Sequence, residues 1–221
     1  MLILAFDAST PVITVALARE EEGKRQVLAE ISATSGGASE VLLRSIHKAL
    51  ELTGENLESV GRILVGVGPG TFTGIRIAAS TARSLSQGTG ITLARNSTLS
   101  ALASPALSVR QEVLAVLDAK RGQVFAQRFT DGASGEILCV TPDQLISEDE
   151  PLIVGDGAVR YRNELSELGT IPPDASPLHR VTATGHVLSA DLSPVRPEDI
   201  VPLYVREPDA EVRRDLNPWS S

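Results

Sequence analysis

The sequence contains the same predicted order of elements twice, and this repeat limits the possible fold more than any other feature. One apolar strand ends at Asp7 and another ends at Asp118, and each is followed by an alanine, a turn and a returning strand. The offset of 111 residues is half of the 221-residue chain. The repeat predicts two βββαβα units in tandem, an α/β fold whose second unit is smaller and therefore reduced.

Composition and proline content divide the chain further. We predict a first unit over residues 1–104, a second over 105–192, and a C-terminal segment over 193–221. That segment is proline-rich at its start, which is typical of a connector, and we expect it to return to the first unit. Only 3% of residues are aromatic, so the cores must consist of Val, Leu, Ile and Ala, as in a protein of sheets and helices.

The first unit is predicted to contain two helices with different faces. The helix over residues 39–53 has apolar residues on one side and Gly54 at its end. The helix over residues 72–87 is rich in Ala and Ser. These small side chains give it a narrow face, which lets another helix approach closely. That face could pack on the protein's own sheet or against a partner. We expect both, with Ile75, Ala79 and Ala82 inward and the opposite edge available.

A glycine-rich run, G-V-G-P-G-T-F-T-G-I-R, occupies residues 66–76 between a strand and the second helix. Backbone N–H groups in such a turn suit an anion at a helix N-terminus. No Lys-Ser/Thr pair follows the glycines, so the run is not a Walker A loop. The alternative is structural, because glycine permits a tight turn and close packing of helix on strand. We favour the structural interpretation.

Charge and the few reactive residues exclude several function classes. The net charge of −8 argues against a basic nucleic-acid surface or a membrane-binding face. The single cysteine, Cys139, cannot form an internal disulfide. The N-terminus has no basic region before Asp7 and resembles no signal peptide or membrane span, so we expect a cytoplasmic protein without a membrane partner.

Four motifs in order carry a resemblance to a known family. The hairpin Asp7-Ala8-Ser9-Thr10 matches the D-x-[GST]-T phosphate hairpin of the actin, sugar kinase and Hsp70 superfamily, whose units are ribonuclease-H-like. The second hairpin, with Asp118 and Gly122, and the late motif P-x-Y-x-R at 202–206 follow. The glycine run is the most specific of the four. The chain thus resembles the bacterial TsaB (YeaZ) family through these motif residues: Gly68, Pro69, Gly70, Phe72, Thr73, Gly74 and Arg76.

The resemblance implies a non-catalytic subunit that pairs with a TsaD-like enzyme. That enzyme carries the metal and transfers threonylcarbamoyl to N6 of adenosine 37 in tRNAs that read codons beginning with A. A TsaE-like ATPase joins the pair, and tRNA meets this chain only indirectly. The family's pairing surface corresponds to the helices over 39–53 and 72–87, with these expected interface residues: Leu42, Ile46, Ala49, Ile75, Ala78, Ala79 and Ala82. Ala38 stands where many members have His. The same helices could instead form a homodimer when the chain is alone.

No residue pattern predicts a catalytic or metal site in this chain. His47, His179 and His186 do not share a helix turn, and two ligands on one metal usually need close spacing. We therefore expect no metal, no catalytic residue and no cofactor of its own, although a nucleotide could bind at the joint with a partner.

The alternative is an actin-like small-molecule phosphotransferase. Asp7 and Thr10 would position a metal-bound phosphate, and Asp118 would do the same in the second hairpin. Against this, aspartates of this kind readily bond the N–H groups of their own turns. We interpret both hairpins, with Ser9 and Gly122, as vestigial phosphate sites.

Overall fold

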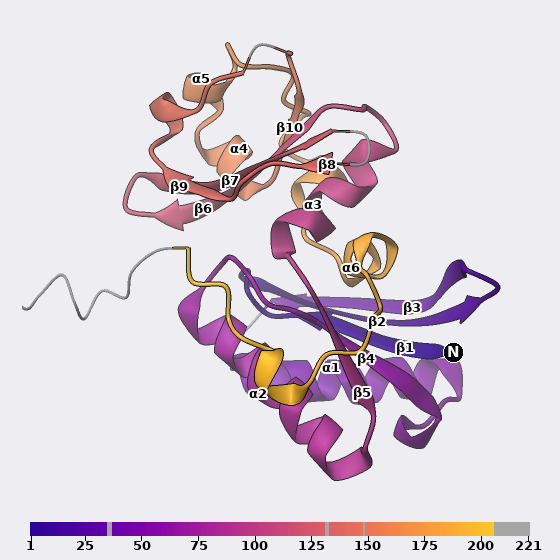
Figure 1. Ribbon diagram of the computed structural model, residues 1–221. Helices are drawn as coiled ribbons and strands as arrows, with labels where there is room; N and C mark the ends of the chain where they lie inside the picture. Colours follow the sequence, from indigo (N-terminus) through magenta and orange to yellow (C-terminus); the bar gives the residue numbers. More distant parts are fainter. Residues whose placement is uncertain (35–36, 131–132, 148, 206–221) are drawn as a thin grey trace, which may run out of the picture.

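The computed structural model describes residues 1–34, 37–130, 133–147 and 149–205, which form two sheets joined by crossing helices (Figure 1). The first sheet has the strand order β3-β2-β1-β4-β5. Strands β1 to β3 are antiparallel, and β4 and β5 run parallel to β1. Its strands are β1 (Leu2–Asp7), β2 (Val12–Glu21), β3 (Lys24–Thr34), β4 (Val60–Gly66) and β5 (Thr92–Asn96).

The second sheet repeats this arrangement and confirms the predicted duplication. It has the order β10-β6-β7-β8, and β9 also pairs with β7. As in the first sheet, an antiparallel hairpin is followed by a strand, β10, that runs parallel to its first strand. The strands are β6 (Val113–Lys120), β7 (Gln123–Thr130), β8 (Ala133–Ser134), β9 (Leu138–Val140) and β10 (Leu152–Val154). The α/β class with two ribonuclease-H-like units is therefore correct.

Both sheets have five strands within the described residues, so the second sheet is not reduced in strand number. The helical elements differ more. The helices are α1 (Ala38–Thr53), α2 (Phe72–Thr89), α3 (Thr98–Leu107), α4 (Asp156–Arg160), α5 (Arg162–Leu165) and α6 (Ala183–Ser189). Short 3-10 turns are η1 (Leu57–Ser59), η2 (Pro142–Gln144), η3 (Pro177–His179) and η4 (Pro197–Asp199). The three-residue η2 follows β9 at the position where the 16-residue α1 follows β3.

Successive residues of β1 contribute to two cores, one on each face of the first sheet. Leu4 and Phe6 belong to the core cluster under α1 and α2. Ile3 and Ala5 belong to the opposite cluster, which α6 covers with Ala183 and Val187. Successive residues of a strand point to opposite faces, so this one strand supplies both cores.

The pairing residues expected from the sequence lie in the protein's own core, which corrects that prediction. All seven, from Leu42 on α1 to Ala82 on α2, are at most 6% exposed, and all except Ile75 belong to the core cluster between these helices and the first sheet. The inward orientation expected for Ile75, Ala79 and Ala82 is confirmed. The amphipathic pattern marked the face of each helix that the sheet covers, and burial of each Leu or Ile there stabilises the fold by roughly 1.5–3 kcal/mol.

Helix α3 connects the two units. The side chain of Ser97 accepts a hydrogen bond from the Leu99 backbone N–H, as a helix cap does. The buried residues of α3, including Leu102 and Ala106, pack with β6 and β7 of the second sheet. The predicted boundary near Ser104 falls inside this helix, so the change from one core to the other comes earlier, at about Ser97.

Most of the described part of the C-terminal segment lies against the first unit, and Val205 packs on the core of the second unit. The Val195 N–H donates to the Leu93 carbonyl of β5, and the Leu203 N–H donates to the Val67 carbonyl. Ile200 is fully buried in the cluster under α1 and α2. Figure 1 shows this segment, in yellow, passing alongside α2. Arg206 and the rest of the predicted segment lie outside the described residues.

Among the described residues, no helix has both the length and the apolar character needed to cross a membrane.

Two adjacent leucines of α1 test the assignment of its faces. Leu42 is fully buried and Leu43 is 50% exposed. Leu42→Ala should lower the free energy of unfolding by about 2–5 kcal/mol, because it leaves a cavity against the sheet. The matched Leu43→Ala should change it by less than about 0.5 kcal/mol. Urea unfolding measures both, and equal effects would contradict the packing described here.

Candidate functional site

The first hairpin begins at Asp7, whose carboxylate is sealed inside the protein. Asp7 is the last residue of β1 and is 1% exposed. Its Oδ1 accepts a hydrogen bond from the Ser9 backbone N–H at 2.6 Å. Its Oδ2 accepts from Thr98 Oγ1 at 2.8 Å and from His186 Nε2 at 2.8 Å. Both carboxylate oxygens are therefore engaged within the chain.

The number of available protons determines which group donates in each hydrogen bond around Asp7. The Thr98 hydroxyl proton is used on Asp7, so the 2.9 Å contact between Ser9 Oγ and Thr98 Oγ1 has Ser9 as its donor. His186 is fully buried and must donate from Nε2, because a carboxylate only accepts. The partners come from the hairpin, from the start of α3 and from α6, three regions far apart in the sequence.

Electrostatics favour the ionised form of Asp7. Burial by itself raises the pKa of the Asp7 carboxyl, but the hydrogen bond from His186 and the charge of that ring, with the hydrogen bonds from Ser9, outweigh it. The pKa is lowered overall, so the carboxylate remains charged and bonded in the folded protein.

The glycine motif packs directly on this hairpin. The Thr71 N–H donates to the Ser9 carbonyl at 2.6 Å. A Cβ at Gly70 would overlap the Ser9 carbonyl, and a Cβ at Gly74 would overlap the Ala8 carbonyl. The space that a phosphate would need near these glycines is thus filled by the hairpin backbone. The structure supports the structural interpretation of the motif, since close approach of two backbones requires glycine.

Other motif residues divide between the interior and the surface. Gly68 and Pro69 are buried, whereas Phe72, Thr73 and Arg76 are exposed on the first two turns of α2. In the hairpin, Thr10 Oγ1 donates to the Val12 carbonyl at 2.8 Å, so this hydroxyl holds its own turn.

The second hairpin has a different environment. The Asp118 side chain is 4% exposed and pairs with Lys120 Nζ at 2.8 Å and with Arg160 at 3.2 Å. Burial alone would raise the pKa of Asp118, but the side-chain and backbone hydrogen bonds of Lys120, together with the Lys120 and Arg160 charges, lower it. Gly122 lies in the turn between β6 and β7, with a positive φ of 77°.

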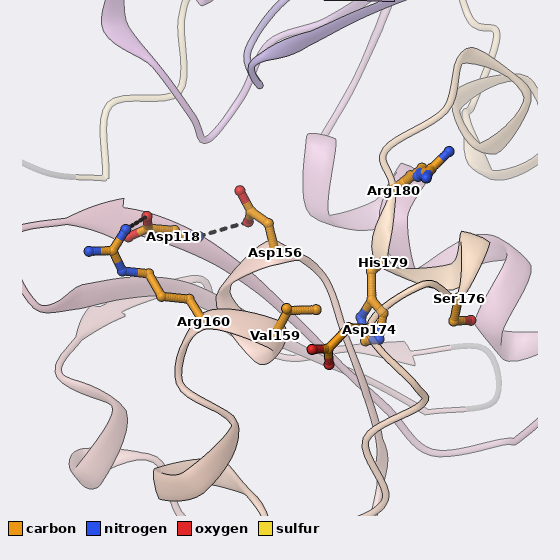
Figure 2. Close-up of a pocket in the computed structure, with 8 residues that line it drawn as sticks. All are labelled: Asp118, Asp156, Val159, Arg160, Asp174, Ser176, His179 and Arg180. Carbon is orange, nitrogen blue, oxygen red and sulfur yellow. Dashed lines mark hydrogen bonds and ion pairs between the residues drawn. The ribbon is translucent and has the colours of Figure 1, made fainter.

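Asp156 lies beside Asp118 at the start of α4. Its Oδ1 accepts from the Asp118 backbone N–H at 3.0 Å, as the dashed line in Figure 2 shows. Burial raises the pKa of Asp156 and the negative charge of Asp118 adds to the rise, although the hydrogen bond from the Asp118 backbone opposes it. This carboxyl is therefore easier to protonate than an ordinary aspartate.

A pocket of about 380 Å³ adjoins these groups, and Figure 2 shows the side chains around it. Its lining residues are Asp118, Asp156, Val159, Arg160, Asp174, Ser176, His179 and Arg180. The volume is within the range of small-molecule sites, and the pocket adjoins the carboxyl ends of β6 and β10, where α/β folds bind ligands.

Two side chains of this pocket, His179 and Asp174, are already bonded to other groups of the chain. His179 Nδ1 accepts from the Gly155 N–H at 3.1 Å, and Nε2 lies 3.2 Å from the Pro172 carbonyl, to which it donates. Asp174 is ion-paired with Arg162. The arrangement therefore offers charged groups for binding but no nucleophile next to a general base.

Within the part of the chain that the structure describes, no cluster of three or more His, Cys, Asp or Glu side chains could hold a metal ion. His47 is exposed on α1, as expected. The hydrogen bond from His186 Nε2 to Asp7 was not predicted from the sequence. Thr98 was missed as well. No local signal could have revealed either residue, because 179 positions separate His186 from Asp7 and 91 separate Thr98 from it.

The fold and the hairpins define a two-unit protein of the ribonuclease-H-like, actin-related class. The family model described as TsaD, tRNA N6-adenosine threonylcarbamoyltransferase, matches residues 32–148, more than half of the chain. A TsaB protein of Bacillus subtilis, named for tRNA threonylcarbamoyladenosine biosynthesis, is 30% identical over 145 residues, 65% of this chain and 61% of the relative. The chain belongs to the TsaB/YeaZ family and carries a domain of the TsaD family model.

Two further relatives match over nearly the whole length. An uncharacterized protein of Mycobacterium tuberculosis is 28% identical over 213 residues, 95% of this chain and 93% of its own. The solved structure of YeaZ from Pseudomonas aeruginosa has a TM-score of 0.76 and 24% identity, and covers 92% of this chain and 99% of its own. At 24% identity, the similarity to the YeaZ structure supports the fold alone.

Two glycines of α2 test the packing of the motif on the hairpin. Gly74→Ala should lower the free energy of unfolding by about 1–3 kcal/mol or more, because the new methyl group overlaps the Ala8 backbone. Gly88→Ala is the control, since a Cβ there meets nothing within 4 Å. It should raise stability by roughly 0.5–1 kcal/mol, as in other helices. Thermal unfolding measures the stability of both variants. If Gly74→Ala leaves the stability unchanged, α2 does not approach the Ala8 backbone as closely as described here.

The buried Asp7 carboxylate makes the stability of the fold depend on pH. Because folding lowers the pKa of Asp7, its charge stabilises the fold above the unfolded value of about 3.9, and this contribution is lost as pH falls further. Asp7→Asn should cost roughly 3–5 kcal/mol at pH 7, since its amide N–H₂ faces the Thr98 and His186 donors. The deficit should shrink below about pH 4.

The exposed Asp143→Asn serves as control and should change stability by less than about 0.5 kcal/mol. Urea unfolding from pH 7 to pH 3 measures both variants. A deficit of Asp7→Asn that does not depend on pH would argue against an ionised carboxylate.

Proposed function

We propose that this chain is a non-catalytic subunit that pairs with a TsaD-like enzyme and supports N6-threonylcarbamoylation of adenosine 37 in tRNAs that read codons beginning with A. The names of its TsaB relatives and the matching TsaD family model support this role. The observation that carries the non-catalytic part is the sealing of Asp7, whose two oxygens are bonded to Ser9, Thr98 and His186.

The same observation argues against the phosphotransferase alternative. A hairpin that positions a metal-bound phosphate needs an aspartate with an oxygen turned to the ligand. Asp7 has none, and Thr10 donates to its own turn. Asp118 is held by Lys120 and Arg160. Supplying either carboxylate to a substrate would require breaking these bonds.

The exposed faces of α1 and α2 are the proposed pairing surface. The two helices lie on one side of the first sheet and contact each other. Their outward residues follow helical spacing: Leu43 and His47 on α1, and Arg76, Ser80 and Ser84 on α2. We name these five the pairing stripe. The small serines let a partner helix approach closely, as required when ridges of one helix pack into grooves of another.

The remaining assignments follow from the family and rest on the same proposal. A TsaE-like ATPase joins the pair, and tRNA contacts this chain through the complex. The chain has no cofactor of its own, and the joint with the partner is where a nucleotide could bind. In isolation the pairing stripe mediates a homodimer that the TsaD-like partner displaces. The complex acts in the cytoplasm.

Substitutions on the pairing stripe test the proposal without disturbing the core. Leu43→Glu and Ser84→Arg should each weaken binding to a purified TsaD-like partner at least about tenfold, roughly 1.4 kcal/mol, by placing charge and bulk in the interface. Leu188→Glu is the control, because Leu188 is 53% exposed on α6, across the sheet. Sedimentation of the mixed proteins measures the affinity.

Three results would speak against the proposal. Unchanged affinity in both stripe variants would place the interface elsewhere. Absence of any complex with the unmodified chain would remove the subunit role. Tight Mg-ATP binding with turnover by the chain alone, seen by calorimetry, would favour the phosphotransferase.

A further inference from the structure

Two sequence motifs that are 128 positions apart meet at one exposed site. Arg76 of the glycine motif donates from Nε to the Tyr204 hydroxyl at 2.8 Å. The Arg76 guanidinium carbon lies 3.6 Å from the centre of the Phe72 ring, and the Phe72 and Tyr204 ring centres are 5.4 Å apart. We name Phe72, Arg76 and Tyr204 the anchor cluster.

The anchor cluster is held in place from both sides. Phe72 and Arg76 are one helical turn apart on α2, so their side chains are neighbours. The C-terminal segment is tied along the same helix, because Leu203 N–H donates to the Val67 carbonyl and Arg83 donates to the Ile200 carbonyl at 2.6 Å. The guanidinium is therefore oriented before any partner arrives, which reduces the entropy lost on binding.

The cluster contributes little to the core of its own unit. Phe72 and Tyr204 are each 44% exposed, and Arg76 is exposed as well. Among the described residues, the terminal nitrogens of Arg76 make no hydrogen bond or ion pair, so they can donate two parallel bonds. Exposed aromatic rings around an arginine are typical of the residues that dominate protein–protein binding energy.

Charge indicates what the cluster would bind. Helix α2 contains Arg76 and Arg83 but no acidic residue, in a chain whose net charge is −8. Val201 and Leu203, which precede Tyr204 in the same segment, are exposed apolar residues as well. A cation framed by apolar groups suits a single carboxylate on a protein, whereas a nucleic-acid backbone would meet the repulsion of the whole chain.

We infer that the anchor cluster receives an acidic side chain of the partner protein, bound by the two terminal nitrogens of Arg76 and covered by the rings of Phe72 and Tyr204. The inference rests on the proposed function, since the partner is the TsaD-like subunit. It adds the C-terminal segment to the pairing surface. Residues 200–204 then act as a strap that positions Arg76, so the end of the described chain controls the strength of pairing.

Titration calorimetry with the purified full-length chain and a TsaD-like partner tests this. Arg76→Ala should weaken binding at least 30-fold, and Arg76→Lys should weaken it less, because an ammonium keeps the charge but not the paired geometry. Tyr204→Phe should weaken binding about threefold to tenfold by releasing the guanidinium. Raising the salt concentration should weaken the unmodified pair more than the Arg76→Ala pair.

Arg110→Ala is the matched control, an exposed arginine of the α3–β6 connection that contacts Thr170. It should leave the affinity unchanged. Circular dichroism of each variant confirms that the fold is retained, and Tyr204→Phe keeps the test valid if Arg76→Ala does not fold.

The outcomes separate the two proposals. If the unmodified chain binds the partner and Arg76→Ala binds equally well, the anchor is refuted and the subunit role stands. If the unmodified chain does not bind, both fail. If Arg76→Ala loses affinity for tRNA but keeps it for the partner, the cluster is an RNA contact and the carboxylate assignment is wrong.

Discussion

The buried carboxylate of Asp7 is the interaction on which the rest of the structure depends. A charge without solvent is tolerated only when its hydrogen bonds are complete, and here they come from Ser9, Thr98 and His186. These partners belong to the first hairpin, to the helix that leads into the second sheet, and to α6, which returns from it. The hydrogen bonds to Asp7 therefore hold the start of α3 and helix α6 against the first hairpin. These two helices are also where the chain passes between the two units. The glycine motif completes the enclosure, because Gly66, Gly70 and Gly74 leave room for the carboxylate and for the hairpin backbone.

This enclosure changes what the duplicated fold can do. In the superfamily that the chain resembles, the two hairpins face a phosphate, but here the first is filled by the protein's own side chains. The second adjoins a pocket, where Asp118 is paired with Lys120 and Arg160 and the Asp156 carboxylate accepts a hydrogen bond from the Asp118 backbone. What remains available is the outer surface of α1 and α2, carried on a rigid sheet. The proposed partner surface therefore lies on helices that pack against a hairpin whose aspartate is bonded within the chain.

Sequence reasoning recovered the architecture well and the surface poorly. Hydrophobic alternation and the repeat around Asp7 and Asp118 led to the two sheets, and the helix over 39–53 was placed within one residue of α1. The expected interface residues, such as Leu42 and Ala79, were wrong in position, because an apolar stripe on a helix first indicates the face that its own sheet covers. The division near Ser104 was displaced because a helix carries no mark of which sheet it packs on. His186 was missed because its role depends on a partner at the other end of the chain.

The sequence by itself determined the fold class, the duplication and the family, since these follow from local periodicity and from motifs of adjacent residues. Only the tertiary structure decided which residues of those motifs are inside and which are outside. Gly70 and Gly74 serve a backbone contact, whereas Phe72 and Arg76, from the same run, meet Tyr204 on the surface. The physical reason is that burial, ion pairing and exposure are set by segments that approach from elsewhere in the chain. The spacing of residues in a motif indicates the turn and the helix that it forms. It does not indicate which distant segments of the chain pack against them.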